Sequence, residues 1–162
     1  MSQELHFKLL EVSDLTDIME IERQTAKSPW SASMMRDSLR AAHNRVWGVF
    51  ESVEEKQLIG YAVVSVVIDE AEVLSININN NLQHKGYGKH LVSFVIKQMM
   101  VHKVQNVFAY VRVSNKPAKS LFEKFGFKQI STREKYYPAN KTAVSEDAIV
   151  FGLDISDVAV IY

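Results

Sequence analysis

One short segment of the chain has residue types that suit the binding of an anion. It carries two glycines and three basic side chains: Gly86, Gly88, His84, Lys85 and Lys89. A helical pattern follows directly, and the first turn of a helix has unpaired backbone N–H groups and partial positive charge. Glycine has no Cβ, so an anion can approach the backbone closely there. The segment therefore predicts a phosphate or pyrophosphate site, with an ordinary, tightly packed strand-to-helix turn as the alternative.

These glycines do not fit the better-known nucleotide-binding patterns. Only one Gly-x-Gly pair is present, so the third glycine of the dinucleotide fingerprint is missing. The segment also lacks the Gly-x-x-x-x-Gly-Lys-Ser/Thr spacing of a phosphate loop. The anion site therefore belongs to neither class.

A strand pattern and a helix pattern flank this segment. Apolar residues alternate at Leu74, Ile76 and Ile78, with the period of two that is typical of a strand. The three asparagines that follow, Asn79–Asn81, favour a turn. From Leu91 onward, apolar residues recur at i and i+4, which indicates an amphipathic helix. The anion site is thus predicted at a strand–turn–helix junction.

The spacing Gln83-x-x-Gly86-x-Gly88 after a strand resembles the pyrophosphate-binding motif of the GCN5-related N-acetyltransferases (GNAT). Members of this superfamily bind acetyl-CoA. The resemblance implies that backbone groups of Ile76, Asn77 and Ile78 contact the acetyl and pantetheine part of acetyl-CoA. It also implies that one loop holds the pyrophosphate, through Gln83, His84, Lys85, Gly86, Tyr87, Gly88 and Lys89. The alternative for Ile76 and Ile78 is a plain role in the core.

The other elements fit the same fold. Strand patterns cover residues 5–10, 45–50, 58–68, 107–113, 127–137 and 148–153. Helices are expected after the capping residues Ser13, Ser31 and Asn115, and Asp69–Glu72 is interpreted as an acidic turn before the central strand. This order predicts an α/β (α+β) fold, a GNAT-type mixed, mostly antiparallel sheet of about seven strands flanked by about four helices. We expect a single GNAT N-acetyltransferase domain over residues 1–162.

Further segments resemble one branch of this superfamily in order and spacing. They are Val67–Ala71, Val111–Asn115, Leu121–Phe127, Tyr136–Pro138 and Glu146–Ala148. The branch is that of the ribosomal-protein-alanine N-acetyltransferases (RimI-like), which acetylate the N-terminal alanine of a small-subunit ribosomal protein. The resemblance covers nearly the whole chain.

The same resemblance implies contacts outside the loop. Asn115 would contact the pantetheine region, with a plain helix cap as the alternative. Trp30 on one side and Tyr136 and Tyr137 on the other would flank the groove that receives the acceptor peptide. The alternative for Trp30 is a core anchor between two helices.

The sequence departs from this branch at two positions that matter for catalysis. The branch has a glutamate as general base on the strand before the Ser-Asn pair and a tyrosine as general acid on the next helix. Here these positions hold Tyr110 and Phe122. Glu70 is the candidate for a surviving base, acting through a water, and Tyr110 the candidate for protonating the leaving thiolate. Loss of the base is tolerable for an α-amine, because about 10–15% of it is neutral at pH 7.

Composition narrows the class of protein further. The 162 residues include no cysteine, which excludes disulfides and thiolate metal sites, and we expect no metal. The formal net charge is zero, so the chain lacks the overall positive charge that is typical of nucleic-acid-binding proteins. Neither a signal-peptide pattern nor a membrane-spanning apolar run is present. We therefore expect a cytoplasmic protein with no membrane partner.

These features together predict an acetyl-CoA-dependent N-acetyltransferase. Its partners would be acetyl-CoA and a protein N-terminus, such as the N-terminal alanine of a small-subunit ribosomal protein. Two alternatives stay open. One is an acetyltransferase for a small amine, and the other is a catalytically weak or degenerate member that binds CoA or another protein. The pair Tyr110 and Phe122 favours the second alternative.

Overall fold

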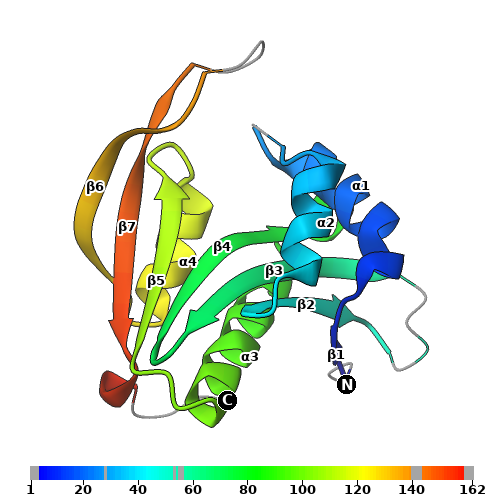
Figure 1. The fold of residues 1–162 in the computed structure, drawn as a ribbon, viewed down its shortest axis with the longest axis horizontal. Coiled ribbons are helices and arrows are strands. Elements are labelled where there is room, and N and C mark those ends of the chain that lie inside the picture. The colour runs from blue at the N-terminus through cyan, green and yellow to red at the C-terminus, as the bar shows by residue number, and fades with distance from the viewer. Residues whose placement is uncertain (1–3, 28, 53, 55–56, 140–143, 159–162) are drawn as a thin grey trace.

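The computed structural model describes residues 4–27, 29–52, 54, 57–139 and 144–158 (Figure 1). The strands are β1 (His6–Leu9), β2 (Asn44–Phe50), β3 (Leu58–Val67), β4 (Glu70–Ile78), β5 (Asn106–Arg112), β6 (Lys128–Tyr137) and β7 (Glu146–Asp154). The α-helices in this part of the chain are α1 (Leu15–Thr25), α2 (Ala32–Arg40), α3 (Tyr87–Val101) and α4 (Lys116–Lys124).

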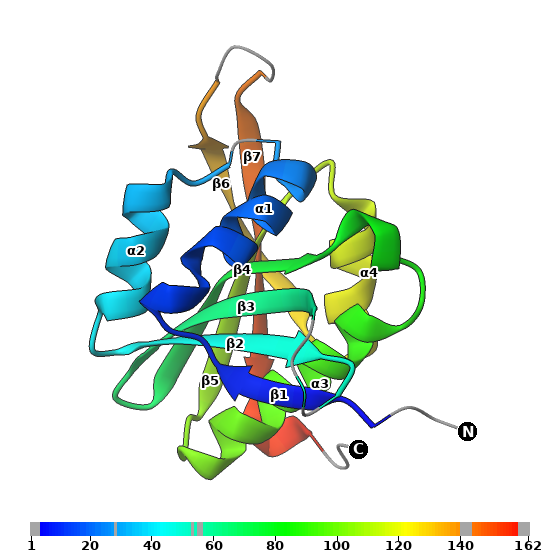
Figure 2. The same ribbon diagram turned by 90° about the vertical axis from the view of Figure 1, so that its right-hand side faces the viewer.

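The strands form one sheet in the order β1-β2-β3-β4-β5-β7-β6. Only β4 and β5 run parallel; the other pairs are antiparallel. Figure 2 shows α1 and α2 in front of the sheet, whereas α3 and α4 pack on its other face. This architecture confirms the predicted mixed, mostly antiparallel sheet flanked by helices.

Two buried clusters hold the layers together, one on each face of the sheet. The larger cluster joins α3 and α4 to the sheet through residues such as Leu91, Ile96 and Phe122. The smaller one joins α1 and α2 to the sheet through residues such as Ile18, Met35 and Val63, all of which are almost fully buried. Strand residues alternate between the two clusters, as the period of two requires.

Helix caps agree with two of the three sequence predictions. The Ser31 side chain accepts the backbone N–H of Met34, and the Asn115 side chain accepts that of Ala118. Ser13, however, does not cap α1. It lies in a 3₁₀ turn, Val12–Asp14, and the helix begins only after Asp14. The Asp14 carboxylate accepts the Glu11 backbone N–H at 2.8 Å, so the turn has its own closing bond.

The prediction of an acidic turn at Asp69–Glu72 was wrong in its extent. Ile68 and Asp69 alone make the turn, and Glu70 already begins β4. Acidic residues are uncommon in strands, which is why this run resembled a turn. The antiparallel pairing of Val67 with Glu70, and of Ser65 with Glu72, extends the strand nevertheless.

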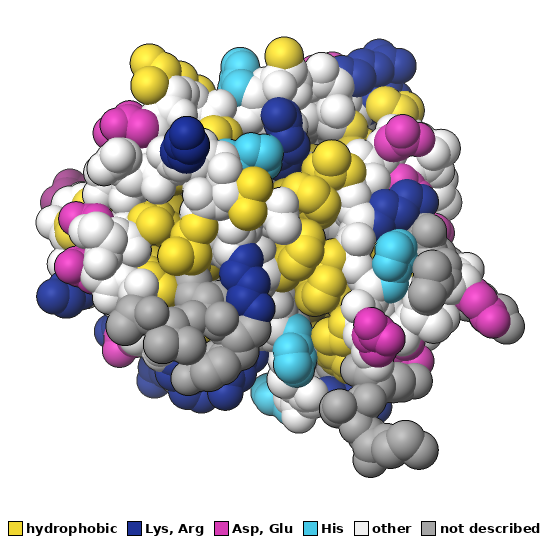
Figure 3. Space-filling model, turned by 90° about the horizontal axis from the view of Figure 1, so that it is seen from below, with side chains coloured by type: hydrophobic (Ala, Val, Ile, Leu, Met, Phe, Trp, Pro, Cys, Tyr) yellow, Lys and Arg dark blue, Asp and Glu magenta, His cyan; other side chains and the backbone are white. Residues whose placement is uncertain are grey.

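The face seen from below carries charges of both signs. Figure 3 shows basic and acidic side chains interspersed around a strip of apolar side chains. Among the described residues, no helix is both long enough and apolar enough to cross a membrane.

Gly60 on β3 allows the close approach of β4. A Cβ at this position would lie 2.6 Å from the backbone oxygen of Asn77 and 2.5 Å from Cδ1 of Ile78. Since a backbone oxygen in a sheet cannot move freely, we expect Gly60→Ala to lower the free energy of unfolding by about 1–3 kcal/mol.

Urea denaturation measures this effect, with Gly88→Ala as the matched control. The Cβ added at Gly88 would lie 3.4 Å from Leu121 Cδ2, an ordinary contact, so the control should be as stable as the parent. Equal midpoints for Gly60→Ala and the parent would show that β3 and β4 can separate without cost.

Candidate functional site

The parallel strands β4 and β5 separate partway along their length (Figure 1). They pair only as far as Val73 and Ala109. Beyond that point β4 continues to Ile78 beside β3 alone, and β5 continues to Arg112 beside β7 alone. The sheet is therefore open between the two strands, and both lose a hydrogen-bonding neighbour on the side that faces the opening.

A β-bulge in β4 marks the place where the strands separate. Val63 pairs with Ser75 and Val64 pairs with Val73, so Leu74 is an extra residue on β4. A bulge bends its strand and increases its twist. The bend therefore turns the second half of β4 away from β5 and helps to create the opening.

The second half of β4 presents backbone groups to this opening. Asn79 donates its N–H to the Ile59 oxygen at 2.8 Å, on the β3 side. Backbone groups of successive strand residues point to alternate edges, so those of Ile78 and Ile76 point to the opening. The Gln83 side chain donates to the Ile78 oxygen at 3.0 Å, which leaves the Ile78 N–H as a donor. The side chains of Ile76 and Ile78 meanwhile pack against the core.

The N-terminus of α3 lies a few residues beyond this strand. Gly86 caps the helix in the left-handed conformation, with φ of 86°, and its oxygen accepts the His90 N–H at 3.2 Å. The N–H groups of the first helical residues have no acceptor within the helix. A Cβ at Gly86 would meet nothing within 4 Å, so the chain is open to solvent beside this glycine at the start of the helix. The exposed side chains of Lys85 and Lys89 add positive charge beside it.

The two glycines have different surroundings. Whereas Gly86 borders open space, a Cβ at Gly88 would point inward, 3.4 Å from Leu121 and 3.8 Å from Ile78. Gly88 thus serves close packing between α3, α4 and β4, which was the alternative for this segment. His84 has a positive φ of 64° and is exposed.

Tyr87 fixes the start of α3 to a distant loop. Its hydroxyl donates to Glu51 Oε1 at 3.2 Å. Partial burial, and then the Glu51 carboxylate, raise the pKa of Tyr87 above its ordinary value. The phenol therefore remains a neutral donor at physiological pH.

Comparison with known proteins identifies the family. The acetyltransferase (GNAT) family model matches residues 15–127. The [ribosomal protein bS18]-alanine N-acetyltransferase of Haemophilus influenzae is 33% identical over 141 residues, 87% of this chain and 92% of the relative. The Escherichia coli protein of the same name is 30% identical over 147 residues, 91% of this chain and 95% of the relative. This chain belongs to the GNAT acetyltransferase family.

Solved structures agree with this assignment. The crystal structure of the ribosomal-protein-S18-alanine N-acetyltransferase from Escherichia coli superimposes with a TM-score of 0.83 at 27% identity, covering 94% of each chain. Arabidopsis thaliana NAA60 in complex with acetyl-CoA has a TM-score of 0.82 at 17% identity, with 94% of this chain and 99% of that chain covered. The second likeness shows a shared fold.

In this acetyltransferase, three tyrosines form an aromatic wall beside the opening, defined as Tyr110, Tyr136 and Tyr137. Ring centroids are 5.2 Å apart for Tyr110 and Tyr136, and 5.0 Å apart for Tyr136 and Tyr137. Arg112 lies over the Tyr137 ring, with Cζ 4.2 Å from its centroid, and Arg133 lies 5.2 Å from that of Tyr110. Such stacking holds the rings in fixed orientations.

The aromatic wall offers hydroxyl donors rather than bases. Burial, more than the neighbouring Tyr136, raises the pKa of Tyr137 to about 12. Burial, followed by Tyr110 and Glu72, raises the pKa of Tyr136. Both phenols are therefore protonated at neutral pH and can donate hydrogen bonds to an acceptor peptide.

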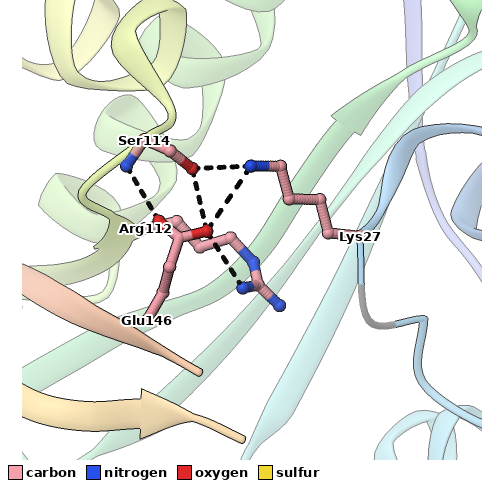
Figure 4. Close-up of polar contacts among 4 residues, drawn as sticks. All are labelled: Lys27, Arg112, Ser114 and Glu146. Carbon is pink, nitrogen blue, oxygen red and sulfur yellow. Dashed lines mark hydrogen bonds and ion pairs between the residues drawn. The ribbon is translucent and has the colours of Figure 1, made fainter. Parts of the chain in front are cut away.

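A polar cluster lies beside the aromatic wall, formed by Lys27, Arg112, Ser114 and Glu146 (Figure 4). Glu146 accepts the backbone N–H of Ser114 at 3.0 Å and its hydroxyl at 2.9 Å. Lys27 Nζ lies 2.9 Å from Ser114 Oγ and 3.5 Å from Glu146, while Arg112 lies 3.4 Å from Glu146. The link after α1 is thereby tied to the ends of β5 and β7.

Favourable contacts decide the charge state of this cluster. Partial burial alone would raise the pKa of Glu146, but the hydrogen bonds from Ser114 and the charge of Lys27 outweigh it and lower the pKa. Glu146 is consequently a carboxylate whose oxygens already have partners. Its register partner on β6 is Tyr137, so the cluster also anchors one end of the aromatic wall.

Trp30 lies on the same side of the sheet as the aromatic wall. It follows Lys27 by three residues, and Lys27 contacts Glu146, the register partner of Tyr137. The indole is half-buried and packs against the cluster under α1 and α2. Trp30 therefore acts as a core anchor, the alternative considered from sequence, while part of its surface remains accessible.

A buried carboxylate connects α1 to the sheet behind the opening. Glu22 is 2% exposed and accepts the Tyr61 hydroxyl, the Trp30 N–H at 3.0 Å and the Asn77 side-chain amide at 3.3 Å. The Asn77 amide also lies 3.0 Å from Ser75 Oγ. Burial, and then the charge of Glu22, raise the pKa of Tyr61 far above its ordinary value. This network fixes the part of β4 whose backbone faces the opening.

The two positions that depart from the family pattern do not face one cleft. Ala109 and Val111 are buried in the core under α3, so Tyr110 points to the opposite face of the sheet. Phe122 lies in that core and is 2% exposed, with the Phe127 centroid 5.1 Å away. Tyr110 and Phe122 therefore lie on opposite faces of the sheet and cannot act as a pair in one cleft.

The structure does not bring Glu70 to the aromatic wall. Glu70 pairs with Asn106 at the beginning of both strands. Tyr110 lies four residues farther along β5, about 13 Å at the usual rise of a parallel strand. Glu72, two residues along from Glu70, lies closer and contributes to the raised pKa of Tyr136, after burial and Tyr110. Of this acidic pair, Glu72 therefore lies nearer to the aromatic wall than Glu70, the candidate base from sequence.

Sequence reasoning also missed the residues that fix the site from α1. Glu22 follows Ile18 by four residues and so shares the apolar side of α1, a pattern that indicates a buried acid. Lys27 gives no comparable signal, because its partners are 87 and 119 residues away in the chain.

The surroundings of Phe122 lead to a prediction about stability. Its ring borders a small apolar cavity, lined also by Ile76 and Val92, where a hydroxyl would find no partner. We expect Phe122→Tyr to lower the free energy of unfolding by about 1–3 kcal/mol, the usual cost of an unsatisfied buried polar group.

The matched control is Phe125→Tyr at the C-cap of the same helix, because Phe125 is only half-buried and an added hydroxyl there can reach water. Urea midpoints of the two variants should differ, with Phe122→Tyr the lower. A Phe122→Tyr protein that is as stable as the parent and faster on peptides would show that the ring edge meets the acceptor cleft.

Proposed function

We propose that this acetyltransferase transfers the acetyl group of acetyl-CoA to the α-amine of a protein N-terminus. The acceptor in this proposal is the N-terminal alanine of a small-subunit ribosomal protein. The observation that carries it is the opening between β4 and β5, which has an unpaired backbone edge on one side and a helix N-terminus at its end.

The opening suits an elongated thioester with a charged end. The pyrophosphate would lie at the N-terminus of α3, where N–H groups, Lys85 and Lys89 surround open space at Gly86. The pantetheine would run along the backbone of Ile76 and Ile78. The Ile78 N–H would then donate to the thioester oxygen as negative charge develops there, an interaction that stabilises the transition state.

The acceptor would approach from the other face of the sheet. There the aromatic wall and the exposed part of Trp30 provide rigid surfaces, which contact a peptide at little cost in conformational entropy. Support for a peptide, rather than a free small amine, comes from the relatives of Haemophilus influenzae and Escherichia coli, whose names specify the alanine of ribosomal protein bS18. Asn115 already caps α4, so we assign it only a secondary contact with pantetheine.

One observation favours a second function. Phe122 is a core residue without an ionisable group and position 110 is a tyrosine, so neither position has the residue type that the family pattern has there. A member that binds CoA without efficient turnover fits these two residues.

The experiment that separates the two functions is mass spectrometry of an N-terminal alanine peptide incubated with acetyl-CoA. We expect a gain of one acetyl group, at a rate well above that without protein, and no gain on the same peptide with a blocked N-terminus. A mixture that acetylates neither this peptide nor its counterparts with other N-terminal residues, while the protein binds CoA, would favour the CoA-binding module.

A second prediction concerns the pyrophosphate. Gly86→Val adds methyl groups to the open space at the α3 N-terminus and strains a residue with positive φ. A hydrogen bond to a charged group is worth about 1.5–3 kcal/mol, so losing one should weaken CoA binding at least about tenfold.

Calorimetry with CoA and with S-acetylpantetheine distinguishes the causes. S-acetylpantetheine has no pyrophosphate, so its affinity should be the same for Gly86→Val and the parent. If the affinities for both ligands fall by the same factor, the variant has disturbed the whole opening. If CoA affinity is unchanged, the pyrophosphate binds elsewhere.

A further inference from the structure

The opening has two sides at its wide end, and the side formed by β4 carries α1. The Asn77 side-chain amide donates to Glu22 on α1 at 3.3 Å. Asn80, just beyond β4, donates to the Gln24 backbone oxygen at 3.1 Å. Trp30 belongs to this side as well, because its N–H donates to Glu22 at 3.0 Å. The end of α1 and the start of the segment that follows it are therefore fixed to β4.

The other side, formed by β5 and β7, carries the aromatic wall. Arg112 lies over the Tyr137 ring, with Cζ 4.2 Å from its centroid, and 3.4 Å from Glu146. Glu146 is the register partner of Tyr137 and accepts both the N–H and the hydroxyl of Ser114. The side chains of Arg112 and Glu146 are only 12% and 17% exposed, so this part of the polar cluster is shielded from water.

Lys27 connects the two sides. It follows the end of α1 by two residues, and its Nζ lies 2.9 Å from Ser114 Oγ and 3.5 Å from Glu146 Oε1. Figure 4 shows its side chain extending from the link after α1 toward these two residues. One cation thus spans the place where β4 and β5 have no hydrogen bonds between them.

We infer that Lys27 is a positioning residue that sets the width of the acceptor groove, by holding the side with Trp30 at a fixed distance from the side with Tyr137. The inference rests on the proposed function and gives Lys27 no contact with the reacting atoms. A groove that is already held at its bound width binds a peptide more tightly, because less conformational entropy is lost on binding.

The size of the effect follows from the exposure of the ion pair. The Lys27 side chain is 56% exposed, so water screens its attraction to Glu146. Contacts of this kind change an equilibrium constant by about fivefold at most. Glu146 is already held by Ser114 and Arg112, so Lys27 meets a carboxylate that needs no further ordering.

The kinetic test compares Lys27→Met with two controls. Lys27→Arg keeps the charge, and Lys128→Met makes the same change at an exposed lysine at the start of β6. We expect Lys27→Met to raise KM for an N-terminal alanine peptide about three- to fivefold, with kcat unchanged. Both controls should match the parent, and CoA affinity by calorimetry should be equal in all four proteins.

A second measurement follows the groove without any substrate. The chain has no cysteine, so two introduced cysteines can be spin-labelled without background. Arg23→Cys on α1 and Thr132→Cys on β6 place labels at exposed positions on the two sides. Electron paramagnetic resonance should give a broader distance distribution, extending to longer distances, when Lys27→Met is added. The distribution should stay as in the labelled parent when Lys27→Arg or Lys128→Met is added.

The remaining outcomes overturn the inference in distinct ways. An unchanged distance distribution in Lys27→Met shows that the groove keeps its width without this lysine. A lower kcat at unchanged KM shows that Lys27 acts on the chemical step. A loss of CoA affinity shows that the contact with Ser114 serves the cofactor and not the acceptor. A parent protein that acetylates no peptide overturns the proposed function and, with it, the role of this spacing in acceptor binding.

Discussion

The site depends on the loss of pairing between β4 and β5 beyond Val73 and Ala109. Backbone N–H and C=O groups are strongly hydrogen-bonding, and native structures leave few of them without a partner. Here two adjacent strands each keep one neighbour and give up the other, so a polar edge faces an opening instead of a strand. Such an edge is favourable only when water or a ligand forms hydrogen bonds with its backbone groups. A thioester with amide groups along its length can supply both the donors and the acceptors.

Two features keep the opening from closing. The bulge at Leu74 shifts the register of β4, so the second half of the strand is turned away from β5. The buried Glu22 holds the same half from the other side through Asn77, and Tyr61 joins them. Burying a carboxylate is costly unless donors surround it. The network thus lowers stability somewhat but fixes the position of the strand. An acyl-transfer site needs this, because a misplacement of the reacting groups by about 1 Å strongly lowers the reaction rate.

The sequence predicted what local interactions decide and missed what distant partners decide. The caps at Ser31 and Asn115 and the turn into α3 at Gly86 depend on neighbours within a few residues, so their patterns were sufficient. The start of β4 depends on β3, which turned an apparent acidic loop into a strand. The sequence could not distinguish the two glycines of the loop. Only Gly86 borders open space, because a Cβ at Gly88 would contact Leu121 on α4.

Position 110 places a tyrosine beside a cation, at the point where the family pattern has a glutamate. Arg133 lies 5.2 Å from the centre of the Tyr110 ring, and Tyr136 stacks on that ring at 5.2 Å. A glutamate at 110 would meet the same guanidinium, and an adjacent cation favours the charged carboxylate, lowers its pKa and weakens it as a base. A tyrosine accepts the cation on its face without this effect. With Arg133 in place, the tyrosine at position 110 therefore holds this cation against the aromatic wall, beside the opening between β4 and β5.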